Sequence, residues 1–228
     1  MIDTVVFDLD GTLRDWEAGI TRALAELRPE VPEQHAGGLD GRLAEATERL
    51  LIVRRNGRVV DRRHYRYAAD PLPQWRDALP DAEPAVVEAL ANRFAELLDA
   101  VPFADVHPAL ERLRDGYALG VLSNGPRPDA PLTRMGFAHY FDAIVSAHGG
   151  EQKPSPRAFL NVLEELGASP EVAVYVGDSI ANDVEGALAA GLTAVWLDRY
   201  GDASPPPAGA HRIASLAELP ELLLELAG

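Results

Sequence analysis

The second half of the chain repeats one pattern, in which a helix-like stretch and a glycine are followed by a short apolar run that ends in a polar or acidic residue. This alternation is typical of βα units. The apolar runs leave no polar face for water, so we expect strands of a parallel sheet that is buried on both faces. The candidate strands are residues 5–7, 118–122, 143–145, 172–176 and 193–197. The predicted fold class is therefore α/β, with a Rossmann-like parallel sheet core covered by helices.

Residues 15–100 differ from the rest of the chain, because no convincing strand appears there and the apolar residues follow helical spacing. Trp16, Ile20 and Leu24 are each four residues apart, and similar spacing recurs within 39–50 and 87–97. We therefore expect 15–100 to be an all-helical insertion. The Rossmann-like core is then assigned to residues 1–14 and 101–228, with linkers near 13–16 and 100–105.

The composition excludes several classes of protein. The 228 residues include no cysteine, which rules out disulfides, thiolate metal sites and a cysteine nucleophile. A net charge of -15 disfavours the backbone of nucleic acids and anionic membranes as partners. The chain has no apolar stretch of membrane-spanning length and no recognisable secretory signal. We expect a cytoplasmic monomer or homodimer with neither a nucleic acid nor a membrane as partner.

Two features in or beside the insertion have alternative interpretations. The arginine-rich segment 54–66 is most simply a solvated surface, and the alternative is an anion-binding role. Arg14 and Trp16 lie beside the first linker, where they could close over a ligand. The spacing of Trp16 instead favours a place in the helical core.

Asp8 and Asp10 follow the first candidate strand directly, in a run that continues through Gly11 and Thr12. Ligands of open α/β sheets bind just outside the carboxyl ends of the strands. Residues two apart on a strand project to the same side, so the two carboxylates repel each other unless a cation or a proton intervenes. The pair therefore indicates a divalent metal site. A simple Asp-Gly turn is the alternative.

Three further strand ends supply what a two-carboxylate site needs. Ser123-Asn124-Gly125 offers a hydroxyl and backbone N–H groups that suit phosphate oxygens. Lys153 is the only lysine beside 20 arginines, which favours a functional point charge over a random surface cation. Asp178 and Asp183 add two more carboxylates, and all-oxygen ligation is the pattern that Mg²⁺ prefers. Helix capping is the alternative for Ser123, Asn124 and Asp183.

With these residues in this order, the chain resembles the haloacid dehalogenase-like superfamily, specifically its phosphatases with a helical cap. Four motifs carry the resemblance, and each one alone would be weak. They are Asp8-Leu9-Asp10-Gly11-Thr12, Ser123-Asn124-Gly125, Lys153-Pro154, and Gly177-Asp178-Ser179 with Asn182-Asp183. The resemblance spans nearly the whole chain and implies that 15–100 is the family's cap domain.

The resemblance also implies a catalytic role for three residues. Asp8 would be the nucleophile and form an aspartyl-phosphate. Asp10 would protonate the leaving alcohol and then deprotonate the attacking water. Lys153 would offset negative charge on Asp8 and on the phosphate. Dehalogenases and phosphonate hydrolases of the superfamily generally lack a carboxylate at the position of Asp10, so its presence favours phosphate esters.

The remaining site residues are assigned from the same resemblance. Asp8, the backbone carbonyl of Asp10 and Asp178 would hold Mg²⁺, and Asp183 would act nearby on a metal-bound water or on Lys153. The phosphate-binding residues would be Thr12, Ser123, Asn124, Gly125 and Lys153.

The expected activity is magnesium-dependent hydrolysis of a small phosphorylated metabolite, a phosphomonoester. One alternative is a phosphoglucomutase-like phosphoryl transfer. A less favoured one is a catalytically idle, phosphate-binding member of the superfamily. Phosphoglycolate-like acids, sugar phosphates and nucleotides are all candidate substrates.

Overall fold

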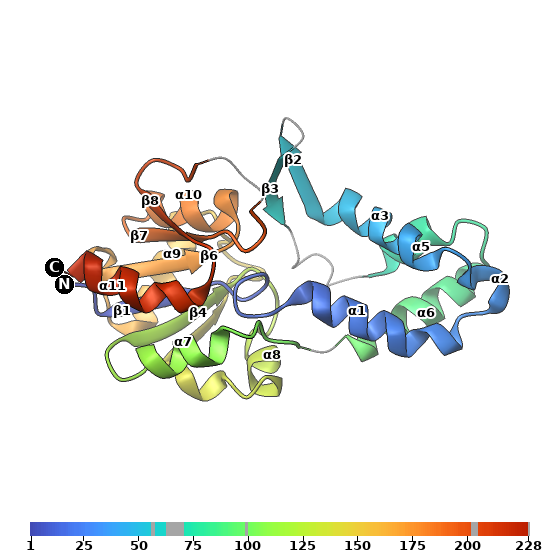
Figure 1. Ribbon diagram of the computed structural model, residues 1–228, viewed down its shortest axis with the longest axis horizontal. Coiled ribbons are helices and arrows are strands. Elements are labelled where there is room, and N and C mark those ends of the chain that lie inside the picture. Colours follow the sequence, from blue (N-terminus) through green and yellow to red (C-terminus); the bar gives the residue numbers. More distant parts are fainter. Residues whose placement is uncertain (56–57, 63–70, 99, 202–204, 228) are drawn as a thin grey trace.

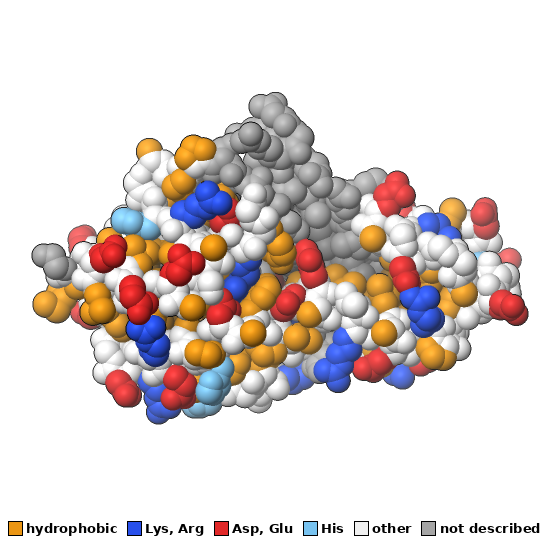
Figure 2. Space-filling view, viewed as in Figure 1, with side chains coloured by type: hydrophobic (Ala, Val, Ile, Leu, Met, Phe, Trp, Pro, Cys, Tyr) orange, Lys and Arg blue, Asp and Glu red, His pale blue; other side chains and the backbone are white. Residues whose placement is uncertain are grey.

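The structure is a computed structural model that describes residues 1–55, 58–62, 71–98, 100–201 and 205–227. For 47–55 and 58–62 it describes the backbone alone. Two parts lie side by side along the long axis, and both described ends of the chain lie at the far end of the sheet-bearing part (Figure 1). Acidic and basic side chains are interspersed over the visible face of both parts (Figure 2).

A six-stranded parallel sheet forms the first part, with strand order β5-β4-β1-β6-β7-β8. Its strands are β1 (Thr4–Phe7), β4 (Ala118–Ser123), β5 (Ala143–Ser146), β6 (Ala173–Gly177), β7 (Thr193–Leu197) and β8 (Ala210–Ile213). The predicted fold class is confirmed, and all five candidate strands are present. The sixth strand, β8, was missed because His211 and Arg212 give it no apolar run, as suits a strand at the edge of the sheet.

Helices cover both faces of this sheet. Val5 and Phe7 face one hydrophobic cluster and Val6 faces the other, as the alternation of a strand requires. The first face is covered by α7 (Val106–Leu113), α8 (Asp129–Arg134) and α11 (Leu219–Ala227), and the second by α9 (Pro156–Leu166) and α10 (Glu185–Ala189). Shorter helical segments are η2 (Ala138–Tyr140), η3 (Pro170–Val172), the π-helical η4 (Ile180–Val184) and η5 (Leu216–Glu218).

The insertion has a hydrophobic core of its own, built from the helical periodicity of its sequence. Trp16, Leu43, Trp75 and Phe94 are all buried in it, which confirms the placing of Trp16 in the helical core. The rings of Trp75 and Phe94 pack with their centroids 5.8 Å apart. The helical segments are α1 (Trp16–Leu27), η1 (Arg28–Glu30), α2 (Glu33–Ala36), α3 (Leu39–Leu51), α5 (Leu72–Ala78) and α6 (Pro84–Leu97).

The expectation that the insertion is all-helical is wrong in one place. Strands β2 (Ile52–Arg55) and β3 (Arg58–Arg62) pair as an antiparallel hairpin. The sequence carries the signal for it, because Asn56-Gly57 between β-branched residues favours a tight hairpin turn. The hairpin lies between the two parts of the molecule (Figure 1), and β3 contacts η4. The side chains of the arginine-rich segment 54–66 lie outside the described residues, so its two interpretations stay open.

The two linkers pair with each other where the chain enters and leaves the insertion. The backbone N–H of Asp15 donates to the carbonyl of Val101 at 2.6 Å, and that of Phe103 donates to the carbonyl of Leu13 at 3.2 Å. No described helix is both long and apolar enough to cross a membrane.

An arginine anchors this crossing to the sheet-bearing part. The guanidinium of Arg199 donates two hydrogen bonds to Asp105, at 2.8 and 3.0 Å, and one to the carbonyl of Thr12 at 2.8 Å. Burial opposes the ionised form of Asp105, but the hydrogen bonds from Arg199, Ser215 and Leu216 outweigh it and lower the pKa of Asp105. The loop that follows β1 is therefore fixed to the second linker.

Candidate active site

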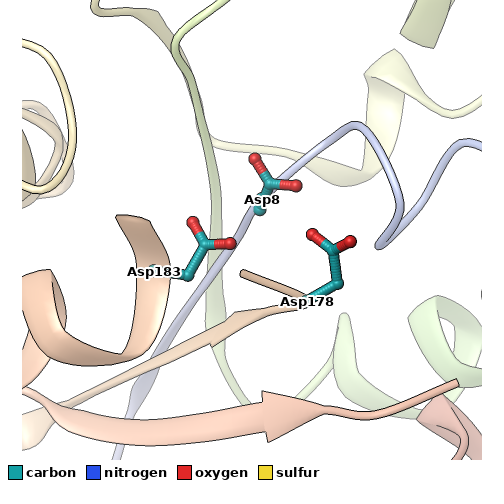
Figure 3. Close-up of side chains that lie close together, drawn as sticks. All are labelled: Asp8, Asp178 and Asp183. Carbon is teal, nitrogen blue, oxygen red and sulfur yellow. The ribbon is translucent and has the colours of Figure 1, made fainter. Parts of the chain in front are cut away.

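Three neighbouring strands bring the predicted site residues to one edge of the sheet. Asp8 follows β1, Asp178 follows β6, and Ser123 ends β4. Asp183 lies on η4, which follows the β6 loop. The carboxylates of Asp8, Asp178 and Asp183 converge (Figure 3), and one oxygen from each lies within 4.8 Å of the others.

Lys153 joins two of these carboxylates. Its Nζ donates to Asp8 Oδ1 at 2.6 Å, to Asp183 Oδ1 at 2.7 Å and to the Tyr175 hydroxyl at 2.8 Å. The side chain is almost fully buried, so these bonds use all three ammonium protons away from water. Burial disfavours the charge, but Asp183 and Asp8 outweigh it and raise the pKa of Lys153. The ammonium is therefore held in a fixed position and stays charged.

The backbone of Lys153 is held by Asn124. The amide Nδ2 of Asn124 donates to the carbonyl of Lys153 at 3.0 Å, and the N–H of Lys153 donates to Asn124 Oδ1 at 2.8 Å. The side chain of Asn124 therefore ties the loop that carries Lys153 to the end of β4. The Asn124 side chain is thus engaged within the fold, which is compatible with the prediction that the backbone N–H is the phosphate-binding group.

Asp183 is bonded at both oxygens. Oδ1 accepts hydrogen bonds from Lys153 and from the Tyr175 hydroxyl, the latter at 3.1 Å, and Oδ2 accepts one from the N–H of Ser179 at 3.0 Å. A Cβ added at Gly177 would lie 2.4 Å from Asp183 Cγ, so the approach of this carboxylate requires glycine there. Of the two partners predicted for Asp183, the geometry places Lys153 in direct contact.

The position of Asp178 is fixed by a hydrogen bond to its backbone and by the close approach of a glycine to its carboxylate. Its carbonyl accepts a hydrogen bond from Trp196 Nε1 at 3.0 Å. Gly11 has φ +92°, and a Cβ there would lie 2.4 Å from Asp178 Oδ2. A side chain at position 11 would both strain the backbone and displace the carboxylate.

Thr12 lies in the loop after β1, and Ser123 and Gly125 lie at the end of the neighbouring strand β4. Ser123 Oγ accepts a hydrogen bond from the N–H of Gly125 at 3.0 Å, which leaves its own proton for another acceptor. Thr12 is fully buried, yet its Oγ1 has no hydrogen-bond partner among the described residues. Asp10 Oδ1 is buried and has no such partner there either. Buried polar atoms of this kind call for a partner, such as a ligand.

The sequence matches the model of one family, described as haloacid dehalogenase-like hydrolase, over residues 2–191. The chain belongs to this family. It is 34% identical to the glyceraldehyde 3-phosphate phosphatase of Methanopyrus kandleri over 220 residues, which cover 90% of this chain and 88% of that protein.

Two solved structures of the same family agree with this assignment over nearly the full length. A HAD phosphatase from Thermococcus onnurineus is 30% identical with a TM-score of 0.61, and covers 97% of this chain and 98% of that one. A 2-haloacid dehalogenase from Pseudomonas syringae is 28% identical with a TM-score of 0.62, and covers 99% and 100%. The overall fold alone therefore does not distinguish a phosphatase from a dehalogenase.

The donor set of this haloacid dehalogenase-like hydrolase fits a divalent cation. Burial, together with the charges of Asp183 and Asp10, raises the pKa of Asp8 from 3.8 to about 7, although Lys153 opposes the shift. One ammonium thus leaves the carboxylate cluster short of positive charge. A small oxygen-ligated cation would supply it, and Asp8 and Asp178 are the side chains best placed to hold one, since both oxygens of Asp183 accept hydrogen bonds.

Three residues of the site were missed or left unassigned by the sequence. Tyr175 is buried beneath Lys153, and the one available signal is that a tyrosine in a fully buried strand needs a partner for its hydroxyl. Trp196 lies two strands from β1 along the sheet, and nothing in the sequence links it to Asp178. Arg14 lies 3.4 Å from Asp10, measured from Nη1 to Oδ1.

Proposed function

We propose that the protein is a magnesium-dependent phosphatase that hydrolyses a small phosphorylated metabolite through an aspartyl-phosphate on Asp8. One observation carries the proposal above the others. Asp8 Oδ1 is bonded to the buried ammonium of Lys153, while Asp10, the carboxylate that a dehalogenase does not need, lies in the same loop. The phosphatase names of the relatives from M. kandleri and T. onnurineus agree with this choice.

In the first step, a carboxylate oxygen of Asp8 attacks phosphorus, and the bond from phosphorus to the leaving oxygen breaks. Among the described residues, Lys153 is the hydrogen-bond donor to this carboxylate and binds Oδ1, so we assign the attack to Oδ2. Lys153 reduces the repulsion between an anionic nucleophile and an anionic phosphate. Asp10 gives its proton to the leaving alkoxide.

In the second step, water attacks the phosphorus of the aspartyl-phosphate and gives a proton to Asp10, while the bond from phosphorus to the Asp8 oxygen breaks. Phosphate is released, and the Asp8 carboxylate and the protonated Asp10 are restored. Ser123, Thr12 and the backbone N–H groups of Asn124 and Gly125 would bind the phosphate oxygens. Mg²⁺ held by Asp8, the carbonyl of Asp10 and Asp178 would offset negative charge on the phosphate.

The proposed division of labour follows the predicted domains. Residues 1–14 and 101–228 form the catalytic core, and residues 15–100 act as a cap that excludes water and selects the substrate. The separate hydrophobic core of the insertion supports this division. The crossing of the two paired linkers would be its hinge.

A phosphate-release screen over a panel of phosphomonoesters with Mg²⁺ tests the proposal, with Asp8→Asn as the blank. We expect the wild-type protein to release phosphate from at least one ester and the variant to release none. Isomerisation of a sugar phosphate without free phosphate would favour the mutase alternative. Binding of phosphate esters without turnover would favour an idle protein, and halide release from a 2-haloacid would favour a dehalogenase.

A further inference from the structure

One oxygen of the Asp10 side chain is oriented by a neighbouring cation rather than by a hydrogen bond. Asp10 Oδ1 has no hydrogen-bond partner in the described part of the chain, yet it lies 3.4 Å from Arg14 Nη1. Both side chains are at least nine-tenths buried, at 9% and 8% exposed. Little water reaches the pair, so the attraction between the guanidinium and the electron-rich oxygen of Asp10 is screened far less than at a surface.

Arg14 is itself fixed from several directions. The carbon at the centre of its guanidinium lies 3.9 Å from the ring centroid of Trp16, in a cation–π stack. Its backbone bridges to Asp10 on one side and to Pro102 of the second linker on the other. Its carbonyl accepts a hydrogen bond from the N–H of Gly11 at 3.0 Å. One face of the guanidinium therefore packs on Trp16 of the insertion, and one edge faces Asp10.

Trp16 links this arrangement to the insertion. It is the first residue of α1 and is buried in the hydrophobic core of the insertion, whereas Asp10 belongs to the loop after β1. Arg14 is therefore in contact with both parts of the molecule at once. A shift of α1 relative to the sheet would move the surface on which the guanidinium rests.

We propose that Arg14 is a positioning residue that orients the Asp10 carboxylate and links this orientation to the packing of the insertion. The proposal rests on the proposed function, in which Asp10 protonates the leaving alcohol. A positioned acid matters most for leaving groups that are strong bases, because they cannot depart as anions. A good leaving group such as p-nitrophenolate needs little help.

This difference gives the proposal its test. In Arg14→Met, we expect kcat/KM for a simple alkyl phosphate to fall at least about tenfold more than kcat/KM for p-nitrophenyl phosphate. The parameter kcat/KM is chosen because it reports the step up to the first irreversible phosphoryl transfer and excludes hydrolysis of the intermediate. Arg14→Lys keeps the charge but loses the flat stack, so its effect should lie between those of the wild type and Arg14→Met.

A double-mutant cycle with Asp10→Asn sharpens the result. If Arg14 acts through Asp10, Arg14→Met adds no further dependence on the leaving group once Asp10 is gone. The control Arg112→Met removes an exposed arginine, paired with Glu221, and should leave the ratio of the two substrates unchanged. Thermal unfolding of each variant establishes that it folds, and Arg14→Lys serves if Arg14→Met does not.

Three outcomes would overturn the proposal. Equal losses on both substrates would mean that Arg14 supports the structure alone. Losses that follow a carboxylate on the substrate, rather than the basicity of the leaving group, would mean that Arg14 binds the substrate. Unchanged rates would leave it without a role. Failure of the proposed function has a different signature, because wild-type protein would then release phosphate from neither ester.

Discussion

On one side of Asp8, the buried polar atoms of Lys153, Tyr175 and Asp183 are bonded to one another. We call these three residues the lysine side. In the loop that follows Asp8, which we call the loop side, Asp10 Oδ1 and Thr12 Oγ1 have no hydrogen-bond partner among the described residues. A bonded network is rigid before any ligand arrives, whereas a ligand can supply the hydrogen bonds that these buried atoms do not make within the described part of the chain. The two sides therefore separate what the fold builds from what a ligand must supply.

The largest effect should come from the lysine side. In Lys153→Arg, a planar guanidinium replaces one nitrogen that serves three acceptors, so the charge is kept and the geometry is lost. We expect kcat/KM to fall by at least about 100-fold, the usual effect of losing one preorganised donor. The matched control is Arg157→Lys, at an arginine that is 54% exposed. Wild-type rates in Lys153→Arg would mean that the fixed geometry of the lysine side is not needed for activity.

A cation should stabilise the folded protein in a pH-dependent way. In the folded protein the pKa of Asp8 is raised from 3.8 to about 7, so ionising Asp8 lowers the free energy of unfolding. This loss is absent below about pH 4 and complete above about pH 7. A cation bound to the ionised carboxylate offsets this loss. The apparent affinity for Mg²⁺ should therefore fall about tenfold for each pH unit below about 7.

Thermal unfolding with and without Mg²⁺ measures this effect. At pH 8 and a hundredfold excess over Kd, Mg²⁺ should raise the free energy of unfolding by about 2.7 kcal/mol, and by much less at pH 5.5. Asp8→Asn should lose most of both the stabilisation and its pH dependence. Equal stabilisation of wild type and Asp8→Asn would place the cation elsewhere.

The smaller effects are changes in the free energy of unfolding, and they should differ between the lysine side and the loop side. Tyr175→Phe removes a hydroxyl that is bonded to Lys153 and Asp183, and we expect the free energy of unfolding to fall by about 1 kcal/mol, with a drop in kcat. Tyr140→Phe is its control, because Tyr140 also bonds a carboxylate, that of Glu111, but lies outside the site. It should lose stability without losing kcat.

Thr12→Val should behave differently from Tyr175→Phe. Thr12 Oγ1 is buried, and the described residues provide no hydrogen-bond partner for it, so replacing the hydroxyl with a methyl group removes a desolvated polar atom. We expect the free energy of unfolding to stay the same or rise by up to about 1 kcal/mol, while KM for the phosphate ester increases. Denaturant titration of the two variants side by side measures the contrast. A loss of stability in Thr12→Val equal to that in Tyr175→Phe would mean that the two sides do not differ.

The sequence predicts the strand ends well, because in this fold a buried strand is an apolar run and its end is the first polar residue. Asp8, Ser123 and Asp178 are found in this way. The prediction fails where the hydrophobic pattern does not match the fold. Strand β8 has no apolar run, and the β2–β3 hairpin lies in a segment whose flanks have the apolar spacing of helices.

Contacts between distant elements could not be predicted in the same way. The meeting of Tyr175 with Lys153, or of Trp196 with Asp178, depends on how loops and strands are placed in space. Neither pair has a local signature. The residues that we propose for the chemistry could be predicted from the sequence, and Tyr175 and Trp196, which contact them, could not.

The identity of the phosphorylated residue during turnover shows whether Asp8 is the nucleophile. Asp10→Asn should slow hydrolysis of the intermediate while still reacting with p-nitrophenyl phosphate, so acid quenching and peptide mass spectrometry should find one phosphoryl group on Asp8. The double variant with Asp8→Asn should carry none. Phosphate release by the wild type with the phosphoryl group on another residue, or on no residue at any time point, would contradict the account.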